Sequence, residues 1–196
     1  MTATPARART RDPARKQRIL SAAADLIARD GYHTVSMSDI GAASGVTGSA
    51  IYRHFPSKSA LLVALFDRAI DALLAAAEHT ADNAPDLDLA LDVMVREQVE
   101  FVVAQRAVAQ VYHREVHSLP VEDSRRLRRK QRAYVEVWVR LLGDLRPELT
   151  KQHARALVHA AIGAIQSTLF ASDALEGDPL RGLLHRSARA VLRVTA

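Results

Sequence analysis

The spacing of apolar residues constrains the fold of this chain more than any other feature. Apolar side chains recur at three- and four-residue steps along most of the 196 residues, without alternating β-branched runs between turn signals. This pattern predicts an all-α fold of about nine helices. The length suffices for a large apolar core, and the absence of cysteine excludes disulfides and thiolate metal sites.

Turn and capping signals divide the chain into the expected helices. Asp12-Pro13 supplies a cap and a first-turn proline for a helix that stops at Gly31, and Ser36-Met-Ser-Asp39 matches a capping box. Two short helices are expected over about 36–44 and 47–55, the second capped by Thr47. Longer helices are expected from Ser57 to about Ala81, from Leu87 to about Val102, over about 108–117, after Pro120, over about 148–171, and over 179–194 after an Asp178 cap.

The chain carries no sign of a membrane segment. No apolar run approaches the ~18 residues of a membrane span, and the N-terminus lacks the apolar core of a signal peptide. We therefore expect a cytoplasmic protein without a membrane partner. Residues 1–11, rich in Arg, Thr, Ala and Pro, are expected to form a disordered basic tail.

The net charge is concentrated near the N-terminus. Residues 1–58 hold nine Lys/Arg and four Asp/Glu, a net charge of +5, whereas the remainder holds eighteen of each and is neutral. A concentrated basic segment attracts phosphate and suggests a nucleic-acid-binding surface, although a solvated basic face has the same composition.

The segment TGSAIYRHF, residues 47–55, has the character of a reading helix. On a helical wheel Phe55 and Thr47 lie within about 40° of Ile51, and the other side carries Ser49, Tyr52 and Arg53. Gly45-Val46 joins it to the preceding short helix, which is the pattern of a helix-turn-helix. The slim N-terminus, with Gly48 after Thr47, would let backbone N–H groups approach a phosphate or base edge.

Residues 31–66, GYHTVSMSDIGAASGVTGSAIYRHFPSKSALLVALF, resemble the DNA-binding region of TetR-family transcriptional regulators. The matching features are Gly-Tyr after the first helix, Ile40, Gly45-Val46, Ile51-Tyr52-x-His54-Phe55, and Lys58 opening the fourth helix. The resemblance covers about residues 12–75, and the rest agrees only in helix number and length. It implies a DNA-binding domain over 12–57 and a ligand-binding and dimerisation domain over 58–196.

The resemblance also implies which residues meet double-stranded DNA. It puts Ser38 near the DNA backbone, Thr47, Gly48, Ser49 and Arg53 toward the groove, and Tyr52, His54 and Lys58 toward phosphates. Arg53 is the expected base contact, to guanine. Gly41 stands where the family commonly has Ala, and Ser49-Ala50 where a Gly often falls, so the operator sequence stays open.

A unit of three short helices would not need a further 120 or so residues, and the resemblance implies an effector pocket and a dimer interface there. Aromatic and polar residues with the composition of a ligand site are Phe66, Phe101, Tyr112, His113, Tyr134, Trp138, His159, Gln166 and Phe170. Aromatic residues at helical spacing also suit plain core.

The last two helices are the candidates for a dimer interface. They are strongly apolar and contain small residues that permit close approach, the candidates being Leu157, Ala161, Gly163, Ala164, Ile165, Leu183, Leu184, Val191 and Leu192. The alternative is that these residues form the core of a single chain.

Six basic residues crowd into the eight positions from Arg125 to Arg132, just before Tyr134 and Trp138. They suit a phosphate-binding entrance to an apolar tunnel, as for a coenzyme A thioester. This arrangement resembles, more weakly, the TetR-family members that sense acyl-CoA compounds. A solvated helix face balanced by nearby carboxylates is the alternative.

Catalytic and metal-binding patterns are weak. His113 and His117 lie four residues apart, but Glu115 falls on another helix face and no third ligand is evident. No catalytic triad or Gly-rich phosphate loop stands out, so neither an enzyme nor a cofactor is expected. The sequence favours a homodimeric repressor released from a palindromic operator by a small hydrophobic effector, with an acyl-CoA as one candidate. The first alternative is a regulator of an efflux or catabolic gene that responds to an uncharged hydrophobic compound. An architectural DNA binder without an effector is the remaining alternative.

Overall fold

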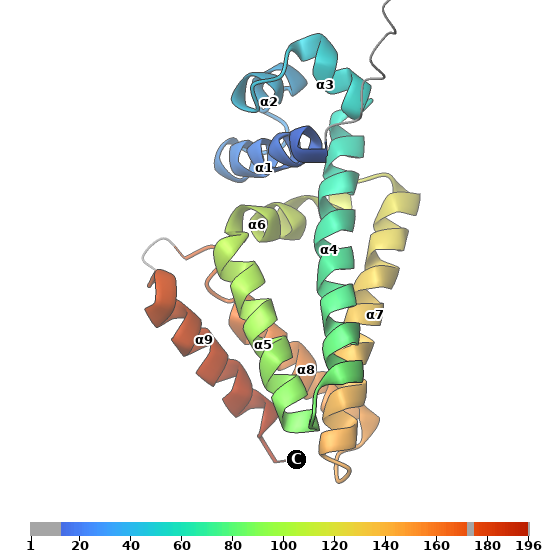
Figure 1. The fold of residues 1–196 in the computed structure, drawn as a ribbon, viewed down its shortest axis with the longest axis vertical. Helices are drawn as coiled ribbons and strands as arrows, with labels where there is room; N and C mark the ends of the chain where they lie inside the picture. Colours follow the sequence, from blue (N-terminus) through green and yellow to red (C-terminus); the bar gives the residue numbers. More distant parts are fainter. Residues whose placement is uncertain (1–12, 172–174, 196) are drawn as a thin grey trace, which may run out of the picture. The chain divides into compact units, whose positions relative to one another are not determined.

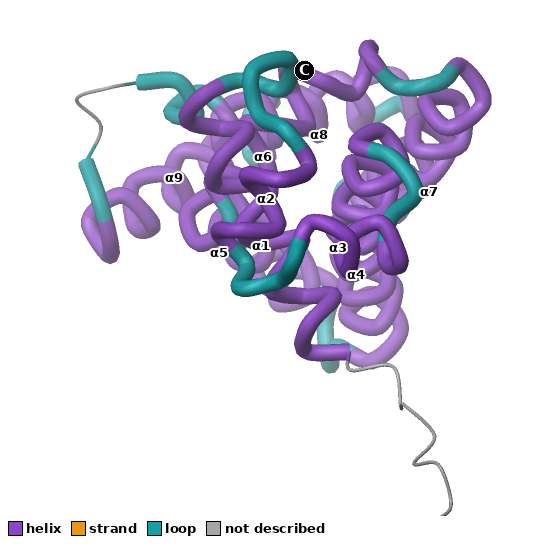
Figure 2. The backbone as a smooth tube through the Cα atoms, turned by 90° about the horizontal axis from the view of Figure 1, so that it is seen from above, coloured by secondary structure: helices purple, strands orange, loops and turns teal. Residues whose placement is uncertain are grey.

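The computed structural model describes residues 13–171 and 175–195. Within these residues the chain forms nine α-helices and one short 3-10 helix, joined by loops and without a strand (Figures 1 and 2). The expected all-α fold of about nine helices is therefore confirmed. The expected basic tail and the Asp12 cap lie outside the described residues. No helix in the described part of the chain is both long and apolar enough to cross a membrane.

The chain divides into two compact units, Met1–Leu61 and Leu62–Ala196. The division falls inside α4, a few residues beyond the expected boundary, and this helix continues from one unit into the other. The first unit contains α1 (Pro13–Asp30), α2 (Met37–Ala43), α3 (Gly48–His54) and the start of α4 (Lys58–Asn83). The second contains the rest of α4, then α5 (Leu87–Ala104), α6 (Arg106–Glu115), η1 (Val116–Ser118), α7 (Val121–Leu145), α8 (Lys151–Gln166) and α9 (Gly177–Leu192).

The first unit is held by a small core and by well-defined helix ends. Ile19 and Ile27 of α1 are buried with Ile40 of α2. The expected capping box is confirmed, because the Ser36 Oγ accepts from the Asp39 N–H at 3.1 Å while the Asp39 carboxylate accepts from the Ser36 N–H at 2.8 Å. These two bonds satisfy N–H groups that the first turn of α2 leaves without helical partners.

The second unit packs α5, α7, α8 and α9 around one apolar core. α5 contacts α7, α8 and α9, and α8 contacts α7 and α9. Figure 1 shows α9 running alongside α5. Trp138 of α7 is fully buried in this core, together with apolar side chains of α5, α8 and α9 such as Val95, Val158 and Ala188.

Two expected helix boundaries in the second unit are wrong. α8 begins at Lys151 because the Thr150 Oγ1 accepts from the His153 N–H at 3.2 Å, and it ends at Gln166 rather than near residue 171. α9 begins at Gly177, so Asp178 lies in its first turn and does not cap it. The Thr150 hydroxyl accepts from an N–H group of the first turn that would otherwise lack a partner, which favours a start at Lys151 over one near residue 148.

Candidate DNA interface and ligand cavity

The turn between α2 and α3 fixes the direction of the second short helix. Gly45 has a φ of 68°, the left-handed conformation that glycine adopts without steric cost. The Val46 N–H donates to the Gly41 carbonyl at 2.8 Å, and the Ser44 hydroxyl donates to the Ile40 carbonyl at 2.7 Å. Two carbonyls in the last turn of α2 are thereby satisfied, and the chain leaves the helix in one defined direction.

α3 has one buried and one exposed face, as the helical wheel predicts. Ile51 and Phe55 are 0% and 2% exposed, whereas Tyr52 is 57% exposed and Arg53 is exposed as well. Arg53 makes no ion pair with any side chain that the structure describes.

Ser38, His54 and Thr47 are three other residues expected to contact DNA, and they lie on α2, on α3 and at the N-cap of α3. Ser38 is exposed on α2, and His54 is partly buried at the end of α3. Thr47 stands at the N-cap position of α3 and is exposed, but its side chain makes no capping bond, so the expected hydroxyl cap is wrong. Only its carbonyl takes part, accepting from the backbone of the first turn of α3. The side chains of residues 48 and 49 lie outside what the structure describes.

Lys58 has partners within the first unit that the sequence did not indicate. Its Nζ donates to the backbone carbonyls of Tyr32 at 2.5 Å and Val35 at 2.7 Å, and it lies 4.4 Å from the centre of the Tyr32 ring. The ammonium group thus ties the start of α4 to the loop between α1 and α2. Two of its three N–H donors are already used.

The second unit contains a cavity of about 470 Å³ lined by residues of α4, α5, α6, α7 and α8. Seven of the nine residues expected at a ligand line it, namely Phe66, Phe101, Tyr112, His113, Tyr134, His159 and Gln166. The structure brings these residues together from five separate helices. The volume falls within the range of about 300–1,000 Å³ that is usual for small-molecule sites.

Trp138 and Phe170 are not among the lining residues. Trp138 is fully buried in the helical core of the unit, where its size fills the space between α7 and its neighbours. Phe170 is 52% exposed after the end of α8, with the Arg114 guanidinium 4.9 Å from its ring centre. Their helical spacing in the sequence did not reveal that α8 ends before residue 170 or that Trp138 points into the core.

The cavity combines apolar walls with basic groups. Ile70, Leu73 and Ile162 line it beside Phe66, whose ring meets that of Tyr112 edge to face at 5.1 Å. The arginine and histidine side chains at the cavity are His113, Arg132, Arg155 and His159. Arg155 pairs with Glu136 of α7. Such a lining combines apolar area with a few polar groups, as is usual for small-molecule sites.

A buried polar pair also lines the cavity. The Tyr134 hydroxyl of α7 donates to the Gln98 Oε1 of α5 at 2.8 Å, and these residues are 7% and 2% exposed. Burial raises the pKa of the Tyr134 hydroxyl, so the group stays a neutral donor at physiological pH. Gln98 was not expected here, although it interrupts the apolar stripe of α5 between Val95 and Val102.

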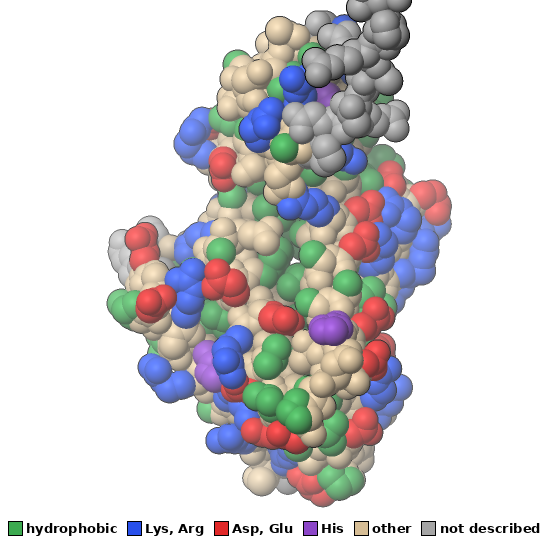
Figure 3. Space-filling view, viewed as in Figure 1, with side chains coloured by type: hydrophobic (Ala, Val, Ile, Leu, Met, Phe, Trp, Pro, Cys, Tyr) green, Lys and Arg blue, Asp and Glu red, His purple; other side chains and the backbone are tan. Residues whose placement is uncertain are grey.

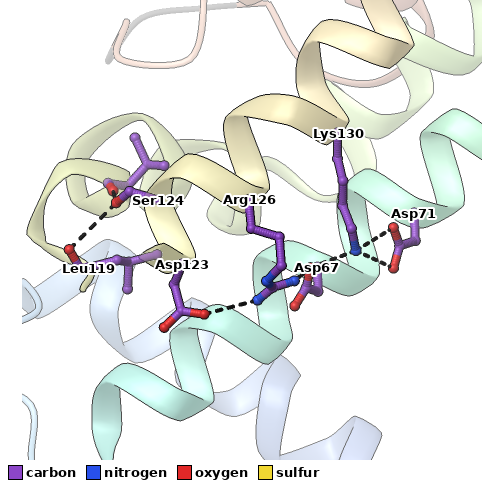
Figure 4. Close-up of polar contacts among 8 residues, drawn as sticks. Asp67, Asp71, Leu119, Asp123, Ser124, Arg126 and Lys130 are labelled. Atoms are coloured by element: carbon purple, nitrogen blue, oxygen red, sulfur yellow. Dashed lines mark hydrogen bonds and ion pairs between the residues drawn. The ribbon is translucent and has the colours of Figure 1, made fainter. Parts of the chain in front are cut away.

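Two residues of the basic run of α7 form ion pairs with α4. Arg126 and Lys130 turn toward α4, where both meet the carboxylate of Asp67 and Lys130 also meets Asp71 at 2.7 Å (Figure 4). Burial opposes the charge of Asp67, yet the hydrogen bonds from both basic groups outweigh it, and the pKa of this carboxyl lies below its usual range.

Two more basic residues of this run have partners away from the cavity. Arg125 pairs with Glu122 at 2.9 Å, and Arg128 contacts a ring nitrogen of His117 at 2.8 Å. Figure 3 shows Lys/Arg and Asp/Glu side chains mixed on the face where α4 and α7 lie. Of the six basic residues, Arg132 alone is among the lining residues of the cavity. The balanced-face interpretation therefore fits most of the run, and only Arg132 is placed to take part in an entrance to the cavity.

The residues expected at a dimer interface fall into two groups. Four are buried within the single chain, at 0–3% exposure, and belong to its core: Ala161, Ile165, Leu184 and Leu192. Leu157, Ala164 and Val191 are partly buried, Leu183 is 43% exposed, and Gly163 is exposed and lines the cavity. The buried group packs α8 and α9 against α5 and α7, which was the stated alternative.

The histidines of α6 and η1 do not form a metal centre with the surrounding side chains. His113 lines the cavity and His117 contacts Arg128. Across residues 13–171 and 175–195, no group of three or more His, Cys, Asp or Glu side chains is arranged to hold an ion.

Comparisons with known proteins agree with both units. Residues 19–65 match the model of bacterial regulatory proteins of the tetR family, and residues 90–169 match a tetracyclin repressor-like C-terminal domain. The transcriptional repressor KstR2 of Rhodococcus jostii is 25% identical over 143 residues, which cover 72% of this chain and 70% of the relative.

Solved structures share the fold at lower identity. A TetR-family regulator from Bordetella parapertussis superposes with a TM-score of 0.81 at 23% identity, covering 95% of this chain and all of its own. The regulator FadR of Bacillus subtilis, solved with stearoyl-CoA, gives a TM-score of 0.74 at 19% identity, covering 92% and 99%. With a helix-turn-helix unit and a helical C-terminal unit that each match models of one family, the chain belongs to the TetR family of ligand-responsive, DNA-binding transcriptional regulators and is not an enzyme.

Proposed function

We propose that this regulator is a cytoplasmic homodimeric repressor that leaves a palindromic operator when an amphiphilic effector fills the cavity of the second unit. The observation that carries the proposal is that cavity, with its apolar walls and its group of basic side chains. A DNA binder without an effector would have no need of it. The solved relative with stearoyl-CoA supports an effector with a long apolar part.

The exposed face of α3 is the proposed reading surface. Arg53 lies beside Tyr52 on a helix whose other face is anchored by Ile51 and Phe55. An arginine that contacts guanine through two hydrogen bonds discriminates against a wrong base by ~1–3 kcal/mol. Replacing Arg53 by alanine should relax sequence preference, and equal losses on operator and random DNA would refute the base contact.

A two-fold dimer through the outer faces of α8 and α9 is the proposed assembly. Small or apolar residues exposed on these helices include Ala160 on α8 and Leu183 and Ala190 on α9. Pairing of these faces would bring two reading units to half-sites one helical turn, ~34–36 Å, or a multiple apart. Leu183→Asp should yield a monomer in sedimentation experiments while preserving helical content, and an unchanged dimer would refute this interface.

Arg132 and Arg155 are the proposed partners of an anionic group on the effector. Both line a cavity that is otherwise largely apolar, and a guanidinium meets carboxylate or phosphate oxygens with two hydrogen bonds. An acyl-CoA or a free carboxylate shares this chemistry. An uncharged effector is the alternative, and it would bind equally well to an Arg132→Gln variant.

α4 is the proposed route from effector to DNA. It contributes Phe66, Ala69, Ile70 and Leu73 to the cavity, and the same continuous helix begins in the first unit at Lys58. An effector that prefers one arrangement of α4 would shift the population away from the DNA-binding form, provided that it binds the two forms unequally.

The deciding experiment is the selection of binding sites from random DNA, followed by release of the best site with dodecanoyl-CoA, dodecanoate and dodecanol. A palindrome released by the two anionic compounds and less readily by the alcohol supports the proposal. Release by the alcohol alone would exclude the anionic effector, and the absence of any selected sequence would overturn operator binding. Leu73→Ala should alter release without altering DNA affinity, and a parallel loss of both would refute the route through α4.

A further inference from the structure

Gln98 is an unusual residue for the wall of an apolar cavity. It is 2% exposed on α5, within a stripe that otherwise consists of apolar residues such as Leu91, Val95 and Val102. A glutamine amide has two donors and an acceptor that each need a partner when buried. A side chain of this kind stabilises a fold poorly unless something meets all of its polar atoms.

The structure supplies a partner for one end of the amide. The Gln98 Oε1 accepts from the Tyr134 hydroxyl at 2.8 Å, while its Nε2 donates to no acceptor in the described part of the chain. The reverse orientation of the amide would leave the buried Tyr134 hydroxyl without an acceptor for its own proton. The observed arrangement therefore satisfies the tyrosine and directs the donor end of the glutamine away from it.

The surroundings of Gln98 make that donor available to a ligand. Both Gln98 and Tyr134 line the cavity, beside the apolar side chains of Leu73, Phe101 and Val135. A plain hydrocarbon chain in this place would bury the amide N–H groups without a partner, which is costly. A ligand oxygen would satisfy them.

We propose that Gln98 recognises a carbonyl oxygen in the apolar body of the effector, which makes the effector an oxo-substituted amphiphile rather than a simple acyl chain. The Gln98 Nε2 donates to this oxygen, and Tyr134 is a positioning residue that holds the amide. The inference rests on the proposed function, since it specifies the ligand of the same cavity. It concerns the body of the effector and is separate from the anionic group assigned to Arg132 and Arg155.

A carbonyl suits this position better than a hydroxyl. The group facing the ligand is a donor, and Tyr134 already uses one of the two lone pairs of the amide oxygen. A ketone or ester oxygen accepts without bringing a proton of its own that must also be satisfied. A hydroxyl would introduce such a proton into a wall that is otherwise apolar.

The test is a positional scan with the full chain. Dodecanoate and its mono-oxo derivatives, with the ketone at each position from C4 to C10, are titrated by displacement of a fluorescent anilinonaphthalene sulfonate, each also as the coenzyme A thioester by thermal shift. We expect one oxo position to bind at least about ten-fold more tightly than dodecanoate, a difference of about 1.4 kcal/mol. A site that hydrogen-bonds a ligand discriminates strongly against analogues that lack the bonding group.

Two variants identify the residue responsible. Gln98→Met keeps the length of the side chain and removes the donor, so the peak in the scan should disappear while dodecanoate binds as well or better. Gln152→Met is the control, because this glutamine of α8 is exposed and does not line the cavity, and the peak should persist. Tyr134→Phe should lower the peak without moving it.

The outcomes separate this inference from the proposed function. A flat scan in which all members bind, a peak that survives Gln98→Met, or a preference for hydroxy over oxo derivatives would overturn the role of Gln98 and leave the anionic effector intact. No binding by any member, with operator binding preserved, would overturn both the role of Gln98 and the proposed effector class.

Discussion

Replacement of Lys58 by methionine distinguishes a residue that contacts DNA from one that builds the DNA-binding unit. The TetR-family resemblance implies a phosphate contact, yet the ammonium group donates to the carbonyls of Tyr32 and Val35 and lies over the Tyr32 ring. Methionine has a similar length and apolar stem but leaves both carbonyls without this donor. We expect the variant to weaken DNA binding by destabilising the first unit.

The magnitude follows from the two hydrogen bonds. Each charge-assisted bond contributes about 1.5–3 kcal/mol at most, and partial exposure together with the ordering of a long side chain offsets much of the sum. A net loss of about 2 kcal/mol is expected for the first unit. It corresponds to a roughly thirty-fold fall in hydrogen-exchange protection, since about 1.4 kcal/mol is a factor of ten.

Two measurements are needed. Exchange protection is followed at the N–H groups of Val35 and Ile40, which donate to the carbonyls of Gly31 and Ser36. The salt dependence of operator affinity is followed by fluorescence anisotropy, because a lost phosphate contact reduces the slope of log K against log salt by about 0.9. We expect lower protection and an unchanged slope.

Lys16→Met is the control for the Lys58 variant. Lys16 also places its ammonium over an aromatic ring, 5.6 Å from the centre of Phe55, and it is exposed. This variant should leave the protection of Val35 nearly unchanged. A fall of about 0.9 in the salt slope of Lys58→Met with full exchange protection would refute the structural role and restore the phosphate contact.

Three further predictions concern stability. Asp67→Asn should reduce the free energy of unfolding by about 1 kcal/mol at pH 7. Because the carboxyl pKa is lowered in the folded chain, this contribution is present above the unfolded pKa of about 3.9 and is lost as pH falls through the folded value. An equal cost at pH 3 in urea melts would contradict this reasoning. Ser36→Ala should cost about 1 kcal/mol through the lost cap of α2, measured by thermal unfolding, and no change would show that the box is dispensable. Tyr134→Phe should reduce the free energy of unfolding by about 1–3 kcal/mol, because it leaves the Gln98 Oε1 without a donor. The double variant with Gln98→Met should lose less stability than the two single variants lose together. Strict additivity of the two losses would argue against the buried bond.

The sequence predicts the local structure of the first unit well because the determining signals are themselves local. The Ser36 capping box, the glycine at position 45 and the alternation of Ile51 and Phe55 with exposed residues all act within a few residues of chain. The partners of Lys58 lie 23 and 26 residues away, so helical periodicity carries no information about them.

In the second unit the sequence identifies the composition of the cavity but not its boundaries. Phe66, Tyr112 and His159 belong to different helices that meet only through tertiary packing. The expectations for Trp138 and the basic run of α7 did not hold in full, because a residue's type does not tell whether its helix face meets a cavity or another helix. Gln98 shows what could have been found, since a lone glutamine in an apolar stripe can be recognised from sequence.

The ion pairs between α4 and α7 restrict how these two helices can move past each other. Asp67 and Asp71 are separated by four residues, and so are Arg126 and Lys130, so both helices present their charges with the same repeat. Because Lys130 meets both Asp67 and Asp71, a slide of less than one helical turn, about 5.4 Å, keeps one carboxylate within its reach while other pairs of the cluster lengthen. The cluster therefore favours the observed alignment of α4 and α7 and lets it shift by a fraction of a turn without leaving every charge unpaired.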